Sequence, residues 1–134
     1  MLVIFYSSLI SYMLFFSICI APLVNIVLDN ENSSKLLRKI FPRNFLFGII
    51  ISLSLVILSI FYSSKLNIIF STIILFTFLL NLLYVMPAIN KAADDAKIKR
   101  TSSEKFKKLH LFSVVLYLIG FLLAVAGLLN LMIM

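Results

Sequence analysis

The chain has 134 residues, of which 63% are hydrophobic and 13% are charged, and its mean hydropathy is +1.16. A chain of this length cannot bury so much apolar surface in water, which excludes a soluble domain. The formal net charge is +7, but every charged residue lies in 29–43, at Lys65 or in 91–108. This confinement excludes the broad basic surface that nucleic-acid binding requires.

Four uncharged runs divide the chain. A hydrocarbon core of about 30 Å requires roughly 20 helical residues, so each run can cross a bilayer once. Helices are the predicted form, because the runs lack the short alternating pattern of barrel strands. We therefore predict an all-α integral membrane protein, a single four-helix transmembrane domain over residues 1–134, with spans at about 2–28, 44–64, 66–90 and 111–134.

The first run has no basic segment before it, so it predicts a retained membrane span and not a cleaved leader. Pro22 lies within this run and frees the carbonyl of Ile18, four residues back. Cys19 is the only cysteine, which excludes an intrachain disulfide and a multi-cysteine metal site. We interpret it as a small buried hydrophobic residue.

The first connection, 29–43, is basic and predicts a short helix at the membrane interface. Its segment 33–41 places four apolar residues on one face, the pattern of an interfacial helix. Pro42 is expected to end this helix, and Asn44 is expected to begin the second span.

The third run approaches its end at Pro87, which frees the carbonyl of Leu83. The charged segment that follows is expected to continue the same helix. Thr101 and Glu104 have the spacing of a capping box, with Thr101 at the N-cap. The last helix is therefore predicted to start near Thr101 and to run through His110 into the membrane.

The basic residues set the orientation. Eleven of the 12 lysine and arginine residues lie in the two long connections, and only Lys65 lies in the other. The positive-inside rule therefore predicts that both long connections are cytoplasmic and that both termini lie outside the cytoplasm. This is the pattern of a multi-pass inner-membrane protein whose basic loops contact anionic lipids.

Each span carries a stripe of small or polar residues. Such stripes let helices approach closely in lipid, and a water-lined cavity is the alternative. In the first span, Ser7, Ser11, Ser17 and Asn25 are expected to face inward. In the second and fourth spans, the predicted helix-packing residues are Gly48, Ser52, Tyr117, Gly120, Ala124 and Gly127.

The three prolines all lie near the predicted cytoplasmic boundary. Kinks alone can explain prolines in spans. However, freed carbonyls in a bilayer need donors or water, and polar residues gather on the same side. The alternative is a polar pocket at the cytoplasmic mouth, with these candidate residues: Pro22, Asn25, Phe41, Pro42, Arg43, Pro87, Asn90, Asp94, Phe106, His110 and Ser113.

His110 is the only histidine. We expect it to hydrogen bond to a proline-freed carbonyl or to Asn90, with a pH-sensitive role as one alternative. Ligation of haem between helices is another, but a second ligand such as Met86, Tyr84 or a lysine, or a second copy of the chain, would be needed. No other cofactor and no metal site is predicted.

Four motifs carry a family resemblance: IAPLV in the first span, KIFPRNF before the second, PAINKAAD closing the third and FKKLHLFS opening the fourth. Together they resemble the bacterial membrane family called domain of unknown function 4149, which is similar to the eukaryotic transmembrane protein 205. The resemblance implies a four-helix membrane protein whose biochemical activity is not established. The association of the eukaryotic relatives with platinum-drug tolerance hints at trafficking or export.

By position, the family pattern falls on Pro22, Phe41, Pro42, Pro87, Phe106, Leu109, His110 and Ser113. Three positions depart from it. Leu111 stands where the family implies an arginine, Tyr117 where it implies an asparagine, and Asn44 where it implies an aromatic residue. A ligand held by those family residues would be bound differently here.

Catalysis is not predicted. Asp94 and Asp95 are adjacent and point about 100° apart on a helix, so they form no acid–base pair. No charged residue lies inside a span, which disfavours a proton-coupled transporter. We predict a non-enzymatic structural or accessory protein that packs with itself or with another membrane protein. The alternative is a haem- or small-ligand-binding protein with a pocket around His110, and an export component is the weakest candidate.

Overall fold

The computed structural model describes all 134 residues, and its regular structure is entirely helical. Two π-helical segments join α1 to α2 and α4 to α5 into continuous rods. The elements are α1 (Leu2–Phe15), η1 (Phe16–Ile20), α2 (Ala21–Val27), α3 (Asn30–Phe61), α4 (Lys65–Leu80), η2 (Asn81–Val85), α5 (Met86–Lys99) and α6 (Glu104–Ile133). The resulting four rods are each long and apolar enough to cross a membrane. The prediction of an all-α chain with four membrane spans is confirmed.

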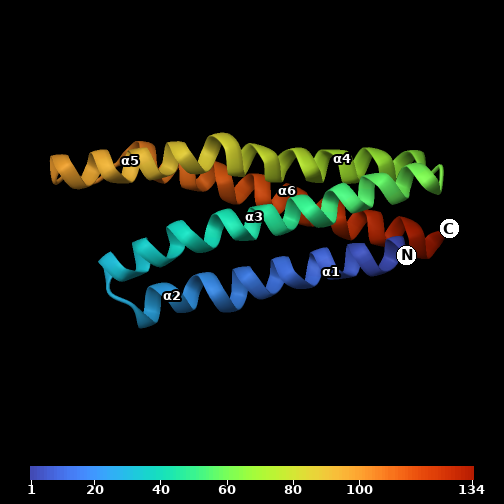
Figure 1. Cartoon of the computed structure of the whole chain (residues 1–134), viewed down its shortest axis with the longest axis horizontal. Coiled ribbons are helices and arrows are strands. Elements are labelled where there is room, and N and C mark those ends of the chain that lie inside the picture. The colour runs from blue at the N-terminus through green and yellow to red at the C-terminus, as the bar shows by residue number, and fades with distance from the viewer.

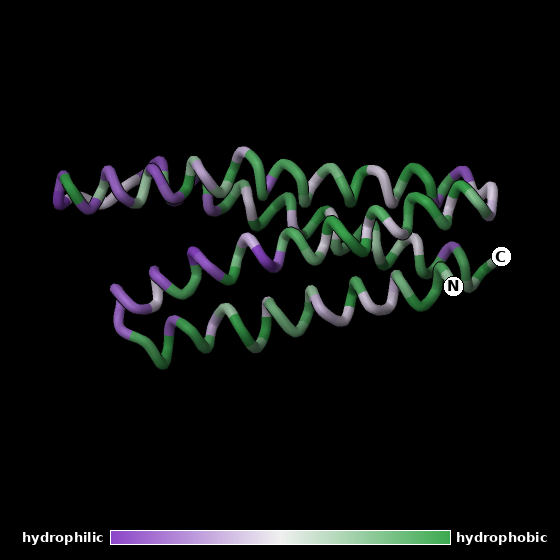
Figure 2. Tube along the Cα trace, in the orientation of Figure 1, coloured by the Kyte–Doolittle hydropathy of each residue, from purple (hydrophilic) through white to green (hydrophobic).

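The rods run side by side (Figure 1). Both termini and the turn between α3 and α4 lie at one end, and the α2–α3 and α5–α6 connections lie at the other. Figure 2 shows hydrophilic residues concentrated at the end with these two connections. Toward this end the α2–α3 pair diverges from the α5–α6 pair (Figure 1), and residues of all four helices line the cleft described below.

Apolar side chains cover much of the outside, and polar side chains fill part of the inside. Phe61 is 80% exposed, whereas Asn67 and Ser71 are fully buried. The apolar core, which includes Tyr6, Leu55 and Phe78, packs around these polar groups. Large exposed apolar side chains would be unfavourable in water, so this distribution requires a lipid bilayer around the rods.

Small residues lie where the rods cross. Gly48, Ser52, Gly120, Ala124 and Gly127 are all buried, and Tyr117 is half-buried. A β-carbon on Gly127 would collide with the ring of Tyr6, and one on Gly48 would collide with Tyr12 and Phe78. The small-residue stripe of α6 is therefore covered by the chain's own helices and is not free to pack against a second copy.

The prediction that small polar residues of the first span face inward holds for Ser17 and Asn25, which line the cleft, but not for the packed part of the span. Ser11 is exposed, and the buried face of α1 consists of Leu2, Tyr6, Leu9 and Met13. The physical reason is size complementarity, because the ring of Tyr6 fills the space that Gly127 leaves open. Cys19 is also exposed, so the prediction that it is buried is wrong.

The prediction of a separate interfacial helix that ends at Pro42 is also wrong. The side chain of Asp29 accepts a hydrogen bond from the Asn32 amide at 3.2 Å and begins α3, which passes through Pro42 without a break. Proline removes only one helical hydrogen bond, and here the turns on both sides of it keep the helix intact.

The third rod continues through the charged segment to Lys99, as predicted. Arg100 then adopts a left-handed conformation (φ 53°) and ends the helix. The next helix begins later than predicted, because Ser103 and not Thr101 is its N-cap. The Ser103 hydroxyl accepts from the Phe106 amide at 3.0 Å, which satisfies one of the free donors of the first turn.

The first and third rods each contain a five-residue π segment that begins six residues before a proline. After each segment an amide donates to the carbonyl five residues back, Ala21 to Phe16 and Met86 to Asn81. No side chain donates to the carbonyls of Ile18 or Leu83, so the prediction that these carbonyls gather polar partners is wrong. Asn25 donates to the carbonyl of Ala21 instead, at 3.4 Å.

The two glycines of α6 should respond differently to alanine. Gly127→Ala forces its β-carbon into the Tyr6 ring and should lower the free energy of unfolding by about 1–3 kcal/mol. Gly120→Ala meets Thr77 Oγ1 at 3.1 Å and Met13 Cε at 3.9 Å, without a collision, and gains helix propensity, so its effect should stay within about 1 kcal/mol. Thermal unfolding in detergent measures both, and equal losses would contradict this packing.

Candidate functional site

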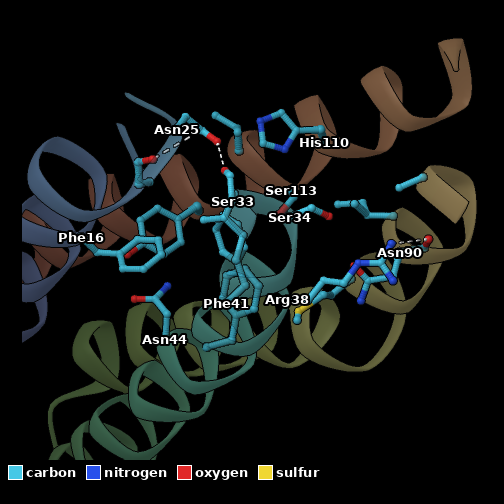
Figure 3. Close-up of a pocket in the computed structure, with 18 of the residues that line it drawn as sticks. Phe16, Asn25, Ser33, Ser34, Arg38, Phe41, Asn44, Asn90, His110 and Ser113 are labelled. Carbon is cyan, nitrogen blue, oxygen red and sulfur yellow. Dashed lines mark hydrogen bonds between the residues drawn. The ribbon is translucent and has the colours of Figure 1, made fainter. Parts of the chain in front are cut away.

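A cleft of about 720 Å³ opens between the diverging rods. Its walls come from the π segment η1 and from α2, α3, α5 and α6 (Figure 3). A volume of this size is typical of small-molecule sites. Most of the pocket residues expected from the sequence lie in its lining, namely Pro22, Asn25, Phe41, Asn90, Phe106, His110 and Ser113.

Four of the expected pocket residues lie outside the lining. Pro42, Arg43 and Pro87 contribute nothing to it. Arg43 is exposed, and its guanidinium donates to the carbonyl of Lys39, one turn earlier on the same helix, at 3.5 Å. Asp94 reaches the cleft only indirectly, through an ion pair with Arg38, which is a lining residue that the sequence did not single out.

Polar contacts between helices surround the mouth of the cleft. The Arg38 guanidinium donates two hydrogen bonds to the Asp94 carboxylate, at 2.5 and 3.2 Å, and so joins α3 to α5. It also donates to the carbonyl of Asn90 at 3.5 Å. On the other side, the Ser33 hydroxyl donates to Asn25 Oδ1 at 2.7 Å and joins α3 to α2 (Figure 3). The charge of Arg38 is therefore already balanced within the protein.

The floor of the cleft is aromatic. Phe16 and Phe41 meet edge to face with ring centroids 5.5 Å apart, and Phe41 lies nearly parallel to Phe45 at 6.0 Å. Tyr117 completes the row, 6.4 Å from Phe45 at a 64° angle. Only Phe41 was expected in the pocket, although an aromatic residue at four-residue spacing from it, Phe45, was a signal that the sequence offered.

Two polar groups at this floor have no hydrogen-bond partner: the side-chain nitrogen of Asn44 and the hydroxyl of Tyr117. Asn44 is only 7% exposed. Its side chain, Tyr12 and Ser17 are the polar neighbours of the Tyr117 hydroxyl, at the margin of hydrogen-bond geometry. Both unpaired atoms have almost no accessible surface, so they are enclosed by the protein and do not open into the cleft. An unpaired buried polar group costs about 1–3 kcal/mol, so these two require an explanation.

His110 lies at the mouth of the cleft and is exposed. Its ring stacks in parallel on Phe106 of the same helix, with centroids 6.1 Å apart. It makes no hydrogen bond to Asn90 or to a freed carbonyl, so that prediction is wrong. The chain also brings together no group of three or more His, Cys, Asp or Glu side chains.

Ser113 has a structural contact at the edge of the cleft. Its hydroxyl donates to Asn81 Oδ1 at 2.6 Å, and the Asn81 amide donates back to the Ser113 carbonyl at 3.5 Å. This reciprocal pair ties α6 to the first residue of the second π segment. Asn81 therefore differs from Asn44, because both ends of its side-chain amide are paired.

A protein-family model described as "Domain of unknown function (DUF4149)" matches residues 4–98. The chain belongs to this family. The sequence resemblance is thereby confirmed, and the DUF4149 match contains the cleft walls that η1, α2, α3 and α5 provide. Comparison with curated proteins and with solved structures finds no match.

Two of the three buried asparagines, Asn44 and Asn81, offer a matched test of the unpaired amide. In protein stripped of small molecules, Asn44→Leu should leave the melting temperature unchanged or raise it, because it removes an unsatisfied polar group. Asn81→Leu breaks a paired contact and should cost about 1–3 kcal/mol. A larger loss for Asn44→Leu than for Asn81→Leu would show that Asn44 has a partner within the chain.

Proposed function

We propose that this DUF4149 protein is a non-enzymatic binding protein of the inner membrane, and that its cleft holds a small amphipathic molecule. The observation that carries the proposal is the 720 Å³ cleft itself, whose lining combines aromatic rings with polar side chains from several helices.

The character of the cleft supports an amphipathic ligand. Four aromatic rings line its floor, and polar side chains of α2, α3, α5 and α6 surround its mouth. Small-molecule sites in proteins commonly combine such an apolar body with a few placed polar groups. A ligand with an apolar end and a polar end matches both regions.

Binding fits this cleft better than catalysis does. A general acid or base must reach a reacting group with its titratable atom. Here the Arg38 guanidinium is engaged by Asp94, and the His110 ring stacks on Phe106. No nucleophile and base form a hydrogen-bonded pair at the cleft, which supports a role in holding a molecule unchanged.

An accessory role is the second candidate, in which the bundle docks on another membrane protein. One observation favours it: Ile98 is 81% exposed within the charged end of α5, beyond the apolar part of the rod. An isolated apolar side chain among lysines is a candidate contact for a partner. The buried small-residue stripe of α6 does not support self-association.

We propose that the cleft opens toward the cytoplasm. The end that carries it also carries both long basic connections, and the positive-inside rule assigns these to the cytoplasm. Lysines around the mouth would then lie at the anionic lipid headgroups. A ligand would enter from the cytoplasmic leaflet or from the cytoplasm.

Cysteine labelling tests this orientation. In a Cys19→Ser background, Tyr62→Cys places a thiol at the α3–α4 turn and Ser102→Cys places one between α5 and α6. A maleimide that does not cross membranes should label the first in intact spheroplasts and the second only after permeabilisation. The cysteine-free parent is the control, and the opposite labelling pattern would overturn the orientation.

Bound small molecules test the binding function. Wild-type protein purified in mild detergent should carry a molecule that mass spectrometry detects. Ala93→Trp places an indole in the cleft wall and should abolish it, whereas Leu53→Trp, on an exposed face of α3, should not. A colourless protein without a copurified molecule would contradict the proposal, and a Soret absorption band lost in His110→Ala would identify haem as the ligand.

A further inference from the structure

We infer that the molecule in the cleft is a phospholipid of the surrounding leaflet, and that one of its acyl chains enters sideways through an opening between α2 and α6. This inference rests on the proposed binding function and names the class and the source of the ligand. Three features of the molecule lead to it: the contacts at the two sides of the cleft, the apolar rim of the open side, and the change of polarity along the lining.

One side of the cleft, between α3 and α5, is closed by polar contacts. The Arg38 guanidinium reaches across it to the Asp94 carboxylate and to the Asn90 carbonyl. Figure 3 shows Arg38 and Asn90 at this side, and Asn25 and His110 at the opposite side. A bidentate contact between two charged groups is stronger than a neutral hydrogen bond, so it holds this side of the cleft together.

The opposite side, between α2 and α6, has no such contact. The first rod packs against α6 along α1, but beyond η1 it packs on α3. Asn25 takes part in both side-chain hydrogen bonds of α2: it donates to the Ala21 carbonyl of its own helix and accepts from Ser33 of α3. The ion pairs of the chain also lie elsewhere. Because no polar contact joins α2 to α6, this is the open side of the cleft.

Exposed apolar side chains border the open side. Val114 of α6 lines the cleft and is 48% exposed, so it lies at the edge of the opening. Leu111 and Leu118, one turn before and after it, are also exposed. On α2, Pro22 lines the cleft and is exposed, and Ile26, one turn further on, is 78% exposed. An apolar rim of this kind is unfavourable in water, so the opening faces the hydrocarbon of the leaflet.

The lining changes from polar to apolar along the cleft. Along α3 its outer part consists mainly of polar residues, from Asn30 to Arg38, and its inner part is aromatic, at Phe41 and Phe45. Headgroup and chain follow the same order in the leaflet outside, so a phospholipid that moves sideways keeps its headgroup at the mouth. About 10 Å of helix separates Arg38 from Phe45, less than the roughly 15 Å depth of one leaflet's hydrocarbon, so the cleft receives the upper part of one chain.

Tryptophan fluorescence tests for a chain in the cleft, because the sequence contains no tryptophan. Phe41→Trp places a reporter in the lining, and Phe47→Trp, on an exposed face of the same helix, is the control that bulk lipid reaches. In vesicles of phosphatidylcholine brominated on one acyl chain, both should lose a similar share of their fluorescence, because bromine quenches at short range. Iodide, which stays in water, should quench neither. Phe45→Trp, one turn deeper in the same wall, repeats the test if Phe41→Trp does not fold.

A matched pair of α2 variants tests the opening. In the Phe41→Trp protein, Ala21→Phe adds a phenyl ring to the lining and should lower the quenching by brominated lipid about threefold, because the ring occupies the space that the chain needs. Leu23→Phe places the same ring on an exposed face of α2 outside the lining and should leave the quenching unchanged. Asp94→Asn removes the ion pair at the other side of the cleft and should also leave it unchanged.

Quenching of the Phe41→Trp reporter by iodide and not by brominated lipid would overturn the inference, because the cleft would then hold water or a water-soluble ligand. A rise in quenching by brominated lipid in Asp94→Asn, without an effect of Ala21→Phe, would also overturn it, because the chain would then enter between α3 and α5. In both cases a copurified molecule displaced by Ala93→Trp would leave the proposed binding function standing. Quenching by iodide in a protein that copurifies no molecule would remove both.

Discussion

Inside a bilayer a backbone amide or carbonyl has no water to bind, and this constraint shapes the whole chain. It restricts the four uncharged runs to helices, and it limits irregular backbone to places where the chain can satisfy itself. The two prolines Pro22 and Pro87 each remove a donor from a rod, and each follows a π segment in which amides bond five residues back. Among the buried side chains, only the Asn44 amide nitrogen and the hydroxyls of Ser59 and Tyr117 lack a hydrogen-bond partner.

The four spans were predictable because a long uncharged run has one solution in lipid. The polar end of the bundle was predictable too, since charge collects only where the runs end. The position of the charged segments therefore predicts that His110, Asn25 and Phe41 lie at the same end of the bundle. Their meeting in one cleft follows from the lengths of the runs and from the alternating direction of four consecutive spans.

The sequence could not predict which face of each span is buried, nor which polar groups at the aromatic floor of the cleft are paired. The sequence offers both a polar and an apolar stripe on the first span, and only the fit of Tyr6 into the gap at Gly127 decides which one is buried. Likewise, Pro42 is a strong local signal for a helix end, but the turns around it outweigh one lost hydrogen bond. Whether Asn44 finds a partner depends on three other helices at once.

The matching spacing of π segment and proline in the first and third rods sets where the cleft begins on these two rods. The cleft lining begins at Phe16 on the first rod and at Met86 on the third, at or directly after each π segment, and it ends at Asn25 and Ala93. With a rise of 1.5 Å per residue, these stretches span about 10–14 Å. Along α3 the lining is longer, from Asn30 to Phe45, about 22 Å. The inner part of the cleft is therefore enclosed by all the rods, whereas its outer part is walled chiefly by α3.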